Sequence, residues 1–321
     1  MRAIVQDRYG PPESLRMTDL PVPEQRAGQM RLQVLACAVN LSEWEYLVGS
    51  PFYARMVGGL RSPKRQVLGS DIVGVIDAIG PEVFGFKIGQ RVMGDLVMER
   101  GGFADYACVK AEHMVPVPEA LDDMQAACLP QAGGIAVAGT AGLEPGDRLL
   151  INGAGGGSGT MALQLALAAG AHVTTVDNAG KTGWLRDLGA DEVIDYRAQD
   201  FTHIGQKWNR ILDMVATRGP GRIARALAPG GRYQAAGGDV GVLLRLLAGG
   251  LVHRLGGKSI GMRMVPSGRT LTAQVAKMAA KGVIKPQLES VQPLSGVPEA
   301  LRRTGQGAVR GKLVICPHLP D

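Results

Sequence analysis

The chain has 321 residues with a formal net charge of +6, and 46 of its residues are glycine. This length allows two domains with separate cores, and the glycine content is typical of an α/β protein with many tight turns, not of a disordered or fibrous chain. The basic residues are scattered and aromatic residues do not alternate with them, which argues against nucleic-acid binding. The sequence shows neither a membrane-spanning run nor a signal peptide, so we expect a cytoplasmic protein without a membrane partner.

The first part of the chain, up to residue 121, alternates short strands with turns. We predict strands over 1–7, 30–36 and 72–79, because apolar and β-branched residues dominate these segments. Glycine and proline mark turns between them, as in 10–12 and 80–81. Many short strands with frequent turns indicate a β-rich, partly open barrel.

A glycine-dense turn follows a predicted strand at 149–152 and opens into a predicted helix over 161–169 that ends at Gly170. A buried strand, a turn nearly free of Cβ atoms and a helix N-terminus form a site for a pyrophosphate, because its oxygens can approach free N–H groups and the positive end of the helix dipole. The register that fits a dinucleotide motif is Ala154-x-Gly156-x-x-Gly159, with alanine in the first place. The residues that we expect to contact the cofactor here are Ala154, Gly156, Gly157, Ser158 and Gly159. A glycine-rich surface loop is the alternative.

The next predicted strand, 171–177, ends in Asp177, about 20 residues after the turn. An acidic residue at this place can accept hydrogen bonds from the ribose of the adenosine. The combination predicts a dinucleotide-binding site.

From 122 to 257 predicted strands and helices alternate, with further strands at 192–194, 210–215 and 231–236. This alternation predicts a parallel, doubly wound sheet of the Rossmann type. The remaining segment contains a predicted helix at 270–281, a short helix at 298–303 and a closing strand at 312–315. We therefore expect one domain formed by 1–121 and 258–321, and a dinucleotide-binding domain formed by 122–257.

These features resemble the medium-chain dehydrogenase/reductase superfamily, and more narrowly its zinc-independent quinone oxidoreductase branch. The matching stretches are 38–40, 68–74, 102–106, 156–159, 188–196 and 310–314. The resemblance covers nearly the whole chain and implies a GroES-like barrel domain, a Rossmann domain, a nicotinamide cofactor and a homodimer.

Zinc-dependent relatives hold their catalytic metal with Cys, His-Glu and a third Cys or Asp. Compared with that pattern, the equivalent places here hold Asn40, Ser70, Asp71 and about Gln131. Asn and Ser are poor zinc ligands, and one carboxylate does not replace a tetrahedral ligand set. The four cysteines, Cys37, Cys108, Cys128 and Cys316, lie far apart, which argues against a structural zinc site and favours buried thiols. We predict that the protein holds no zinc.

The resemblance implies three candidate catalytic residues. Asn40 corresponds to a residue beside the nicotinamide, where its amide could donate to a developing oxyanion; a turn-forming Asn is the alternative. Ser42 takes the place of a proton-relay hydroxyl, or it caps a helix that begins at Glu43. Tyr53 lies in the region that supplies a tyrosine proton donor in some enoyl reductases, or its ring forms part of an apolar wall.

The choice between NADH and NADPH stays open in the sequence. Asp177 favours NADH because a carboxylate repels a 2′-phosphate, while the family favours NADPH. Lys181 falls where the branch places a phosphate-binding lysine, and Tyr196 at a position near the adenosine ribose; for both, an ordinary surface residue is the alternative. Gly237 and Lys312 complete the predicted cofactor-binding set.

Without a Lewis acid to stabilise an alkoxide, hydride transfer to an already polarised acceptor is the feasible chemistry. We therefore predict an NAD(P)H-dependent reductase of quinones or α,β-unsaturated carbonyls, acting on a small molecule. One alternative is a biosynthetic enoyl reductase acting on a larger or carrier-bound substrate. Another is a non-catalytic cofactor-binding protein, favoured by Ile135 where relatives often carry threonine. For a homodimer, the runs 240–244 and 260–265 are candidate contact segments.

Overall fold

The computed structural model describes residues 1–238, 240–254, 256–262 and 268–320, and it divides into two compact units. Unit 1 comprises Met1–Gly134 and Pro266–Asp321, and unit 2 comprises Ile135–Val265. The division falls within helix α4 (Pro130–Thr140). The predicted fold class, a β-rich GroES-like domain with a Rossmann domain, is confirmed.

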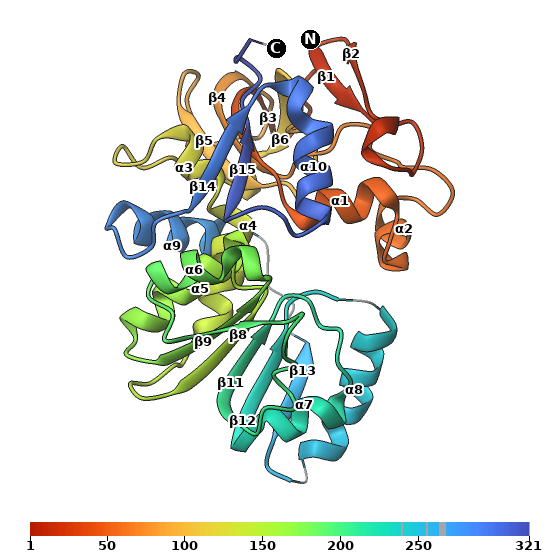
Figure 1. Cartoon of the computed structure of the whole chain (residues 1–321). Coiled ribbons are helices and arrows are strands. Elements are labelled where there is room, and N and C mark those ends of the chain that lie inside the picture. Colours follow the sequence, from red (N-terminus) through yellow and green to blue (C-terminus); the bar gives the residue numbers. More distant parts are fainter. Residues whose placement is uncertain (239, 255, 263–267, 321) are drawn as a thin grey trace. The chain divides into compact units, whose positions relative to one another are not determined.

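Unit 2 is built around a six-stranded sheet with the order β10-β9-β8-β11-β12-β13, in which every neighbouring pair is parallel. Figure 1 labels the strands of this sheet except β10, in colours from yellow-green to light blue. The strands are β8 (Arg148–Asn152), β9 (His172–Asp177), β10 (Glu192–Asp195), β11 (Trp208–Asp213), β12 (Leu227–Ala235) and β13 (Ser259–Met262). The helices are α5 (Gly157–Ala168), α6 (Thr182–Asp187), α7 (Pro220–Ala226) and α8 (Val240–Arg254).

This strand order places β9 and β10, the two strands that follow β8 in the chain, on one side of β8, and it places β11, β12 and β13 on the other. It is the 3-2-1-4-5-6 order of dinucleotide-binding sheets, whose ligands lie beyond the carboxyl ends of the strands where the order reverses. The reversal falls between β8 and β11, which pair from Leu149 to Asn152 with Arg210 to Asp213. The carboxyl edge of these two strands is therefore the place to look for a ligand site.

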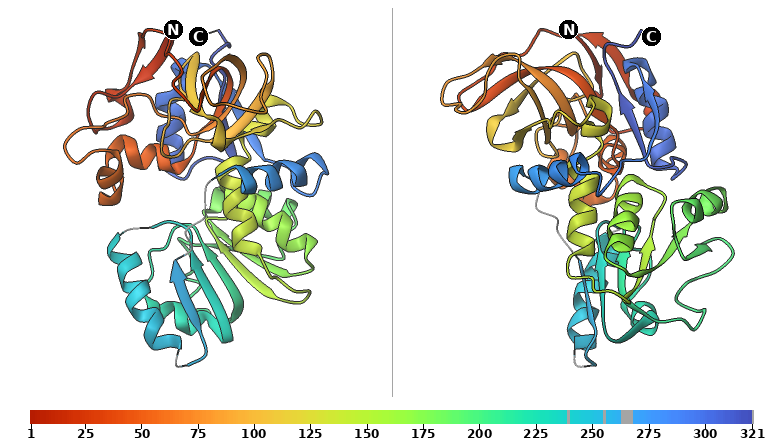
Figure 2. Two further views of the ribbon diagram at one scale, coloured as in Figure 1. Left: turned by 180° about the vertical axis from the view of Figure 1, so that it is seen from behind. Right: turned by 90° about the vertical axis from the view of Figure 1, so that its left-hand side faces the viewer.

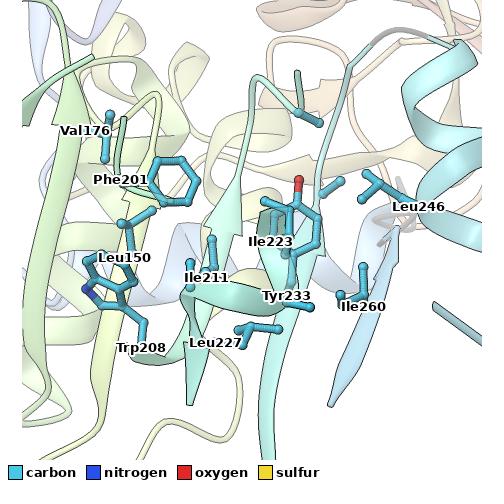
Figure 3. Close-up of a cluster of buried hydrophobic side chains, with 14 of the residues drawn as sticks. Leu150, Val176, Phe201, Trp208, Ile211, Ile223, Leu227, Tyr233, Leu246 and Ile260 are labelled. Atoms are coloured by element: carbon cyan, nitrogen blue, oxygen red, sulfur yellow. The ribbon is translucent and has the colours of Figure 1, made fainter. Parts of the chain in front are cut away.

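The core of unit 2 packs against this sheet, as Figure 3 shows for one cluster of apolar side chains. Leu150 and Ile211 come from the two strands at the reversal point and are buried. Trp208 and Phe201 meet edge to face, with their ring centroids 6.1 Å apart. Because the central strands are buried on both faces, they read as continuous apolar runs in the sequence.

Unit 1 contains a seven-stranded sheet with the path β14-β15-β3-β4-β5-β7, in which β6 also pairs with β3. Figure 2 shows this part of the chain from two further sides. A separate hairpin is formed by β1 (Arg2–Val5) and β2 (Arg16–Asp19). The remaining strands are β3 (Gln29–Ala38), β4 (Asp71–Ile79), β5 (Arg91–Asp95), β6 (Tyr106–Lys110), β7 (Met114–Pro116), β14 (Leu288–Gln292) and β15 (Lys312–Ile315). The helices are α1 (Leu41–Val48), α2 (Phe52–Gly58), α3 (Asp123–Ala127), α9 (Arg269–Ala280) and α10 (Val297–Gly305).

The last part of the chain joins this sheet, because β15 pairs antiparallel with the end of β3. Val314 lies opposite Ala38 and Ile315 opposite Cys37. This pairing brings Lys312, at the start of β15, to the point where β3 ends and α1 begins. A residue near the C-terminus thereby enters a site formed by the first hundred residues.

Most predicted elements match the observed ones in type, with shifted ends. The predicted strand 210–215 ends at Asp213, because the N–H groups of Val215 and Ala216 turn back to the Asp213 side chain. The candidate contact run 260–265 lies in β13 only up to Met262, and 263–265 fall outside the described residues. Over the parts of the chain that the structure describes, no helix combines the length and the apolar character needed to cross a membrane.

Candidate functional site

The glycine-rich turn connects β8 to α5, as predicted, and its backbone geometry explains its glycines. Gly153 has a φ of 84°, which side chains with a Cβ atom rarely adopt. At Gly159 a Cβ atom would lie 2.4 Å from the carbonyl oxygen of Ala154, so only glycine lets the helix pack this closely on the turn. The helix begins at Gly157, earlier than the predicted start at residue 161.

Gly156 plays a different part, because it is the N-cap of α5 and its missing Cβ faces open space. The nearest atom to a Cβ built there is the carbonyl oxygen of Gly153, at 3.7 Å. Helix geometry leaves the N–H groups of Gly157, Ser158 and Gly159 outside the ladder of helical hydrogen bonds. The turn thus offers an uncovered backbone and the positive end of a twelve-residue helix, which together suit a phosphate group.

Asp177, the last residue of β9, is tied directly to this turn. Its Oδ2 accepts a hydrogen bond of 2.7 Å from the N–H of Gly155, and its Oδ1 accepts one of 2.9 Å from the N–H of Asn178. Lys181 places its Nζ 3.4 Å from Asp177 Oδ1. Both side chains are buried, so Lys181 is not the ordinary surface residue considered as the alternative.

The structure also brings Tyr196 to this edge of the sheet. Its backbone N–H donates to the carbonyl oxygen of Asp177 at 3.1 Å, while its ring is exposed and lies near the Arg197 guanidinium. Gly237 follows β12 with a φ of 151°, and a Cβ there would lie 3.2 Å from the carbonyl oxygen of Met214. The predicted cofactor residues of unit 2 therefore all lie at or just beyond the carboxyl ends of its parallel strands.

A buried polar network at the reversal point was missed in the sequence. Asn152, at the end of β8, donates from Nδ2 to Asp213 Oδ1 at 2.7 Å, and Tyr233 donates its hydroxyl to Asp213 Oδ2 at 3.0 Å. Asp213 is completely buried, and it also accepts the N–H groups of the turn after β11. Burial, followed by the neighbouring Asp213 charge, raises the pKa of Tyr233 above its ordinary value. The network fixes the two central strand ends relative to each other.

In unit 1, Asn40 stands between β3 and α1 and is the N-cap of that helix. Glu43 Oε2 accepts a hydrogen bond of 2.7 Å from the Asn40 N–H, as in a capping box. The alternative that Ser42 caps a helix starting at Glu43 is therefore wrong, because the helix starts at Leu41. The Asn40 side chain donates from Nδ2 to Ser70 Oγ at 3.3 Å, and Ser70 donates to Glu43 Oε1 at 2.5 Å.

Lys312 extends this cluster from β15. Its Nζ donates to Asn40 Oδ1 and to the carbonyl oxygen of Val39 at 3.1 Å, and it lies 3.8 Å from Asp71 Oδ2. The N–H of Gln131 donates to Asp71 Oδ1 at 3.1 Å. All of these side chains except Gln131 are buried, so the Lys312 ammonium group is a positive charge shielded from solvent within the cluster.

Ser42 joins the cluster through Gln131, because its hydroxyl donates to Gln131 Oε1 at 3.3 Å. Tyr53 has a different partner: its hydroxyl donates to Glu45 Oε2 at 2.6 Å, and its ring packs against the apolar cluster of unit 1. Burial, followed by the hydrogen bond to Glu45, raises the pKa of Tyr53 above its ordinary value. The structure thus brings Asn40, Ser42 and Lys312 into one network, with Tyr53 bonded elsewhere.

Burial dominates the electrostatics of the carboxyl groups here. It raises the pKa of Glu43 and that of Asp71 above their ordinary values, although the Lys312 charge opposes the shift at both. Burial also raises the pKa of Asp95 to about 6. Cys37 and Cys128 are buried, as expected, whereas Cys108 and Cys316 are half-buried.

The places that hold zinc ligands in related enzymes are brought together in this cluster, but their chemistry does not fit zinc. Asn40, Ser70 and Gln131 offer neutral amide and hydroxyl oxygens, and Asp71 is the single carboxylate. The Lys312 ammonium, within 3.8 Å of that carboxylate, would repel a second cation. Among the residues that the structure describes, no group of three or more His, Cys, Asp or Glu side chains is arranged to hold a metal ion.

Comparison with known proteins agrees with these two units. The alcohol dehydrogenase GroES-like domain matches residues 26–119, and the zinc-binding dehydrogenase family matches residues 188–315. Human quinone oxidoreductase is 30% identical over 98% of this chain and 97% of its own length. A solved structure of Escherichia coli quinone oxidoreductase complexed with NADPH has a TM-score of 0.84, 21% identity, and coverage of 99% of this chain and 100% of that one.

A second kind of relative is much longer than this chain. A mycocerosic acid synthase-like polyketide synthase of Mycobacterium tuberculosis is 31% identical over 91% of this chain, which spans 14% of that synthase. The family models and human quinone oxidoreductase agree with an oxidoreductase. The chain belongs to the medium-chain dehydrogenase/reductase superfamily, in its quinone oxidoreductase branch.

Proposed function

We propose that the protein is an NAD(P)H-dependent reductase that transfers hydride to a quinone or an α,β-unsaturated carbonyl compound, without zinc. The observation that supports this proposal is the pair of features described above: a turn suited to a phosphate with Asp177 at its side, and a cluster that holds Lys312 beside the positions equivalent to zinc ligands. The bound cofactor would supply the hydride, and the acceptor would take a proton in addition. An acceptor that is already electron-poor needs no Lewis acid.

The residues of unit 2 would bind the cofactor. The N–H groups of Gly157 and Ser158 at the start of α5 would hold the pyrophosphate, and Asp177 or Lys181 would face the adenosine ribose. The choice between NADH and NADPH rests on these two last side chains. They form one ion pair, so neither cofactor is favoured by the charge of the pair as a whole.

The residues of unit 1 would orient the acceptor and manage its proton. Asn40 is the proposed donor to the developing oxyanion, and Lys312 holds the Asn40 amide by bonding to its Oδ1. Ser42 and Tyr53 are the two proposed proton-carrying hydroxyls. The raised pKa of Tyr53 makes its hydroxyl a weaker acid than that of an ordinary tyrosine, so it would transfer a proton only to a strongly basic oxyanion.

The test is an absorbance assay that follows consumption of NADH or NADPH against a panel of quinones and enones. In Asn40→Ala we expect kcat to fall by about 10²-fold, as for other lost oxyanion donors, with cofactor affinity nearly unchanged. Asn209→Ala is the matched control, because the one hydrogen bond that the described part of the chain gives the Asn209 side chain comes from the backbone N–H of Arg148. Cofactor binding without turnover on any acceptor would favour a non-catalytic cofactor-binding protein instead.

One observation favours a second candidate function, a biosynthetic enoyl reductase acting on a larger or carrier-bound substrate. It is the 31% identity to a segment of a polyketide synthase. The same assay separates the two candidates when an enoyl thioester is added to the panel. Preference for the thioester over quinones, measured as kcat/KM, would support the biosynthetic role.

A further inference from the structure

Unit 1 contains a cavity of about 160 Å³ that none of the preceding assignments uses. An apolar cavity of similar size, about 150 Å³, is large enough for benzene, so this one accommodates a small functional group with several attached carbon atoms. Unlike that apolar cavity, it has several cationic and aromatic side chains in its lining. They include Tyr9, Tyr46, Lys64, Arg65 and Arg100.

Arg100 is the decisive residue of this wall. It is only 5% exposed, and its Nε and Nη2 are buried without a hydrogen-bond partner in the described part of the chain. Its guanidinium carbon lies 3.2 Å from the centroid of the Tyr46 ring, so the ring face offsets part of the lost hydration. A buried guanidinium with two unsatisfied donor nitrogens is costly unless an acceptor reaches it.

The backbone of Arg100 carries strain as well. Its φ is 57°, in the left-handed region that a residue with a long side chain rarely adopts. Strain of this kind tends to occur at ligand sites, where the surrounding structure maintains it. The fold therefore holds a strained residue in a place where two nitrogens of its guanidinium have no hydrogen-bond partner among the described residues.

The charge around the cavity is positive at its wall and only partly balanced. Lys64 and Arg65 line the same cavity, and the Arg55 guanidinium lies 4.8 Å from the Tyr9 ring centroid. The charge of Arg100 also acts on two carboxyl groups, those of Glu43 and Asp95, and lowers the pKa of each against the larger effect of burial.

These carboxyl groups have other partners, and neither forms an ion pair with Arg100 among the described residues. Glu43 accepts hydrogen bonds from Ser70 and from the Asn40 N–H, and Asp95 accepts one from the Val97 N–H. They reduce the positive electrostatic potential at Arg100, but they accept no hydrogen bond from its Nε or Nη2.

We propose that the Arg100 cavity binds an oxyanion, a carboxylate or a phosphate group, that belongs to the molecule the enzyme reduces. Two adjacent guanidinium N–H groups form a fork that matches two oxygens of such a group. The cavity adjoins the candidate catalytic cluster through α1, because Tyr46 stands on the same helix as Ser42 and Glu43. The oxyanion site follows from the cavity itself, whereas its role for the substrate rests on the proposed function.

The first experiment measures binding in the cofactor-free protein, by calorimetric titration with inorganic phosphate and, separately, with acetate at constant ionic strength. We expect wild type to bind at least one of the two, and Arg100→Met to weaken that binding by at least about tenfold, because two charge-assisted hydrogen bonds are lost. Arg100→Lys keeps the charge but not the fork, and should weaken binding by an intermediate factor. The exposed Arg26, changed to Met, is the matched control for the loss of one charge.

The result also decides between an oxyanion site and a structural cation. If Arg100 serves only to neutralise Glu43 and Asp95, titration with either anion will give the same result for wild type, Arg100→Lys and Arg100→Met, and Arg100→Met will unfold at a lower urea concentration than Arg26→Met. That outcome overturns the proposal. If Arg100→Met does not fold, Arg100→Lys alone carries the test, and binding equal to that of wild type overturns it.

The second experiment tests the role in substrate choice. The kcat/KM for an enone that carries a carboxylate is compared with that for its methyl ester. We expect wild type and Arg26→Met to prefer the carboxylate, and Arg100→Met to lose this preference. Equal use of the two by wild type would overturn the substrate role. Absence of reduction with every acceptor, together with normal phosphate binding, would instead count against the proposed function and leave the oxyanion site standing.

Discussion

Changing Lys312 to methionine tests whether the buried cluster of unit 1 depends on this ammonium group. Methionine keeps an unbranched apolar side chain in the same space but removes the charge, which lies 3.8 Å from the buried carboxylate of Asp71. The Lys312 and Asp71 side chains are 4% and 0% exposed, so solvent cannot replace the lost partner. Breaking a buried pair from one side costs about 3–5 kcal/mol, and we expect a loss of that size at neutral pH.

The loss should depend on pH in a defined direction. Burial raises the pKa of Asp71 and the Lys312 charge lowers it, so the pKa rises further in Lys312→Met. A carboxyl group whose folded-state pKa exceeds its unfolded value destabilises the folded state increasingly as pH rises above the unfolded value, because only the unfolded chain ionises freely. The variant should therefore lose less stability at mildly acidic pH than at neutral pH.

Urea unfolding measures this loss, with Trp44 as the reporter of unit 1 in a background where Trp184 and Trp208 of unit 2 are phenylalanine. The double variant with Lys312→Met and Asp71→Asn removes both charges and should regain most of the lost free energy of unfolding. A loss below about 1 kcal/mol in the single variant, or a double variant no more stable than the single one, would refute a charge-coupled cluster.

Three further changes test unit 2. Gly156→Asp should fold, because the space beside Gly156 is open, but should abolish cofactor binding by placing a carboxylate against the pyrophosphate; unchanged affinity in a fluorescence titration would remove the turn from the site. Asp177→Ser with Lys181 retained should shift the ratio of the NADPH and NADH affinities toward NADPH by about tenfold, since one carboxylate no longer repels the 2′-phosphate, and an unchanged ratio would place the ribose elsewhere. Burial raises the pKa of Asp200, but hydrogen bonds, including one from Arg218, outweigh it and lower that pKa to about 2. Asp200→Asn should thus lower the free energy of unfolding by about 1–2 kcal/mol at pH values above the pKa of the unfolded chain, after allowance for solvent screening. This loss should vanish as pH falls through about 2, and a loss independent of pH in urea unfolding would contradict the reasoning.

The dinucleotide turn could be predicted from the sequence because its signals are local. Gly159 and Gly153 are needed by the backbone itself, and Asp177 follows at the end of the next strand, so short-range spacing is enough to connect them. The Rossmann domain was recognisable for a similar reason, because the alternation of strands and helices along the chain is itself a local pattern.

The long-range parts of the site could not be predicted in this way. Asp213 accepts a hydrogen bond from Asn152, which lies 61 residues away, and the sequence around neither residue indicates this contact. Arg100 looks like one more scattered cation until its burial, its positive φ and its unpaired nitrogens are seen together. Signals of this kind arise only after the chain is folded, because they depend on which distant backbone segment occupies the adjacent space.

The ion pair beside the turn explains why the sequence does not decide between the two cofactors. Asp177 is the proposed acceptor of ribose hydroxyls, and Lys181 is the group proposed to attract a 2′-phosphate, yet their charged ends lie 3.4 Å apart and are buried. To bind Asp177, the ribose of NADH would have to compete with Lys181 for the carboxylate. To bind Lys181, the 2′-phosphate of NADPH would have to draw the ammonium group away from Asp177. Binding of either cofactor would therefore disturb the Asp177–Lys181 ion pair. The selectivity would depend on the difference between the free energies that NADH and NADPH spend on disturbing it. Removing either partner should change the selectivity more than it changes the tighter of the two affinities.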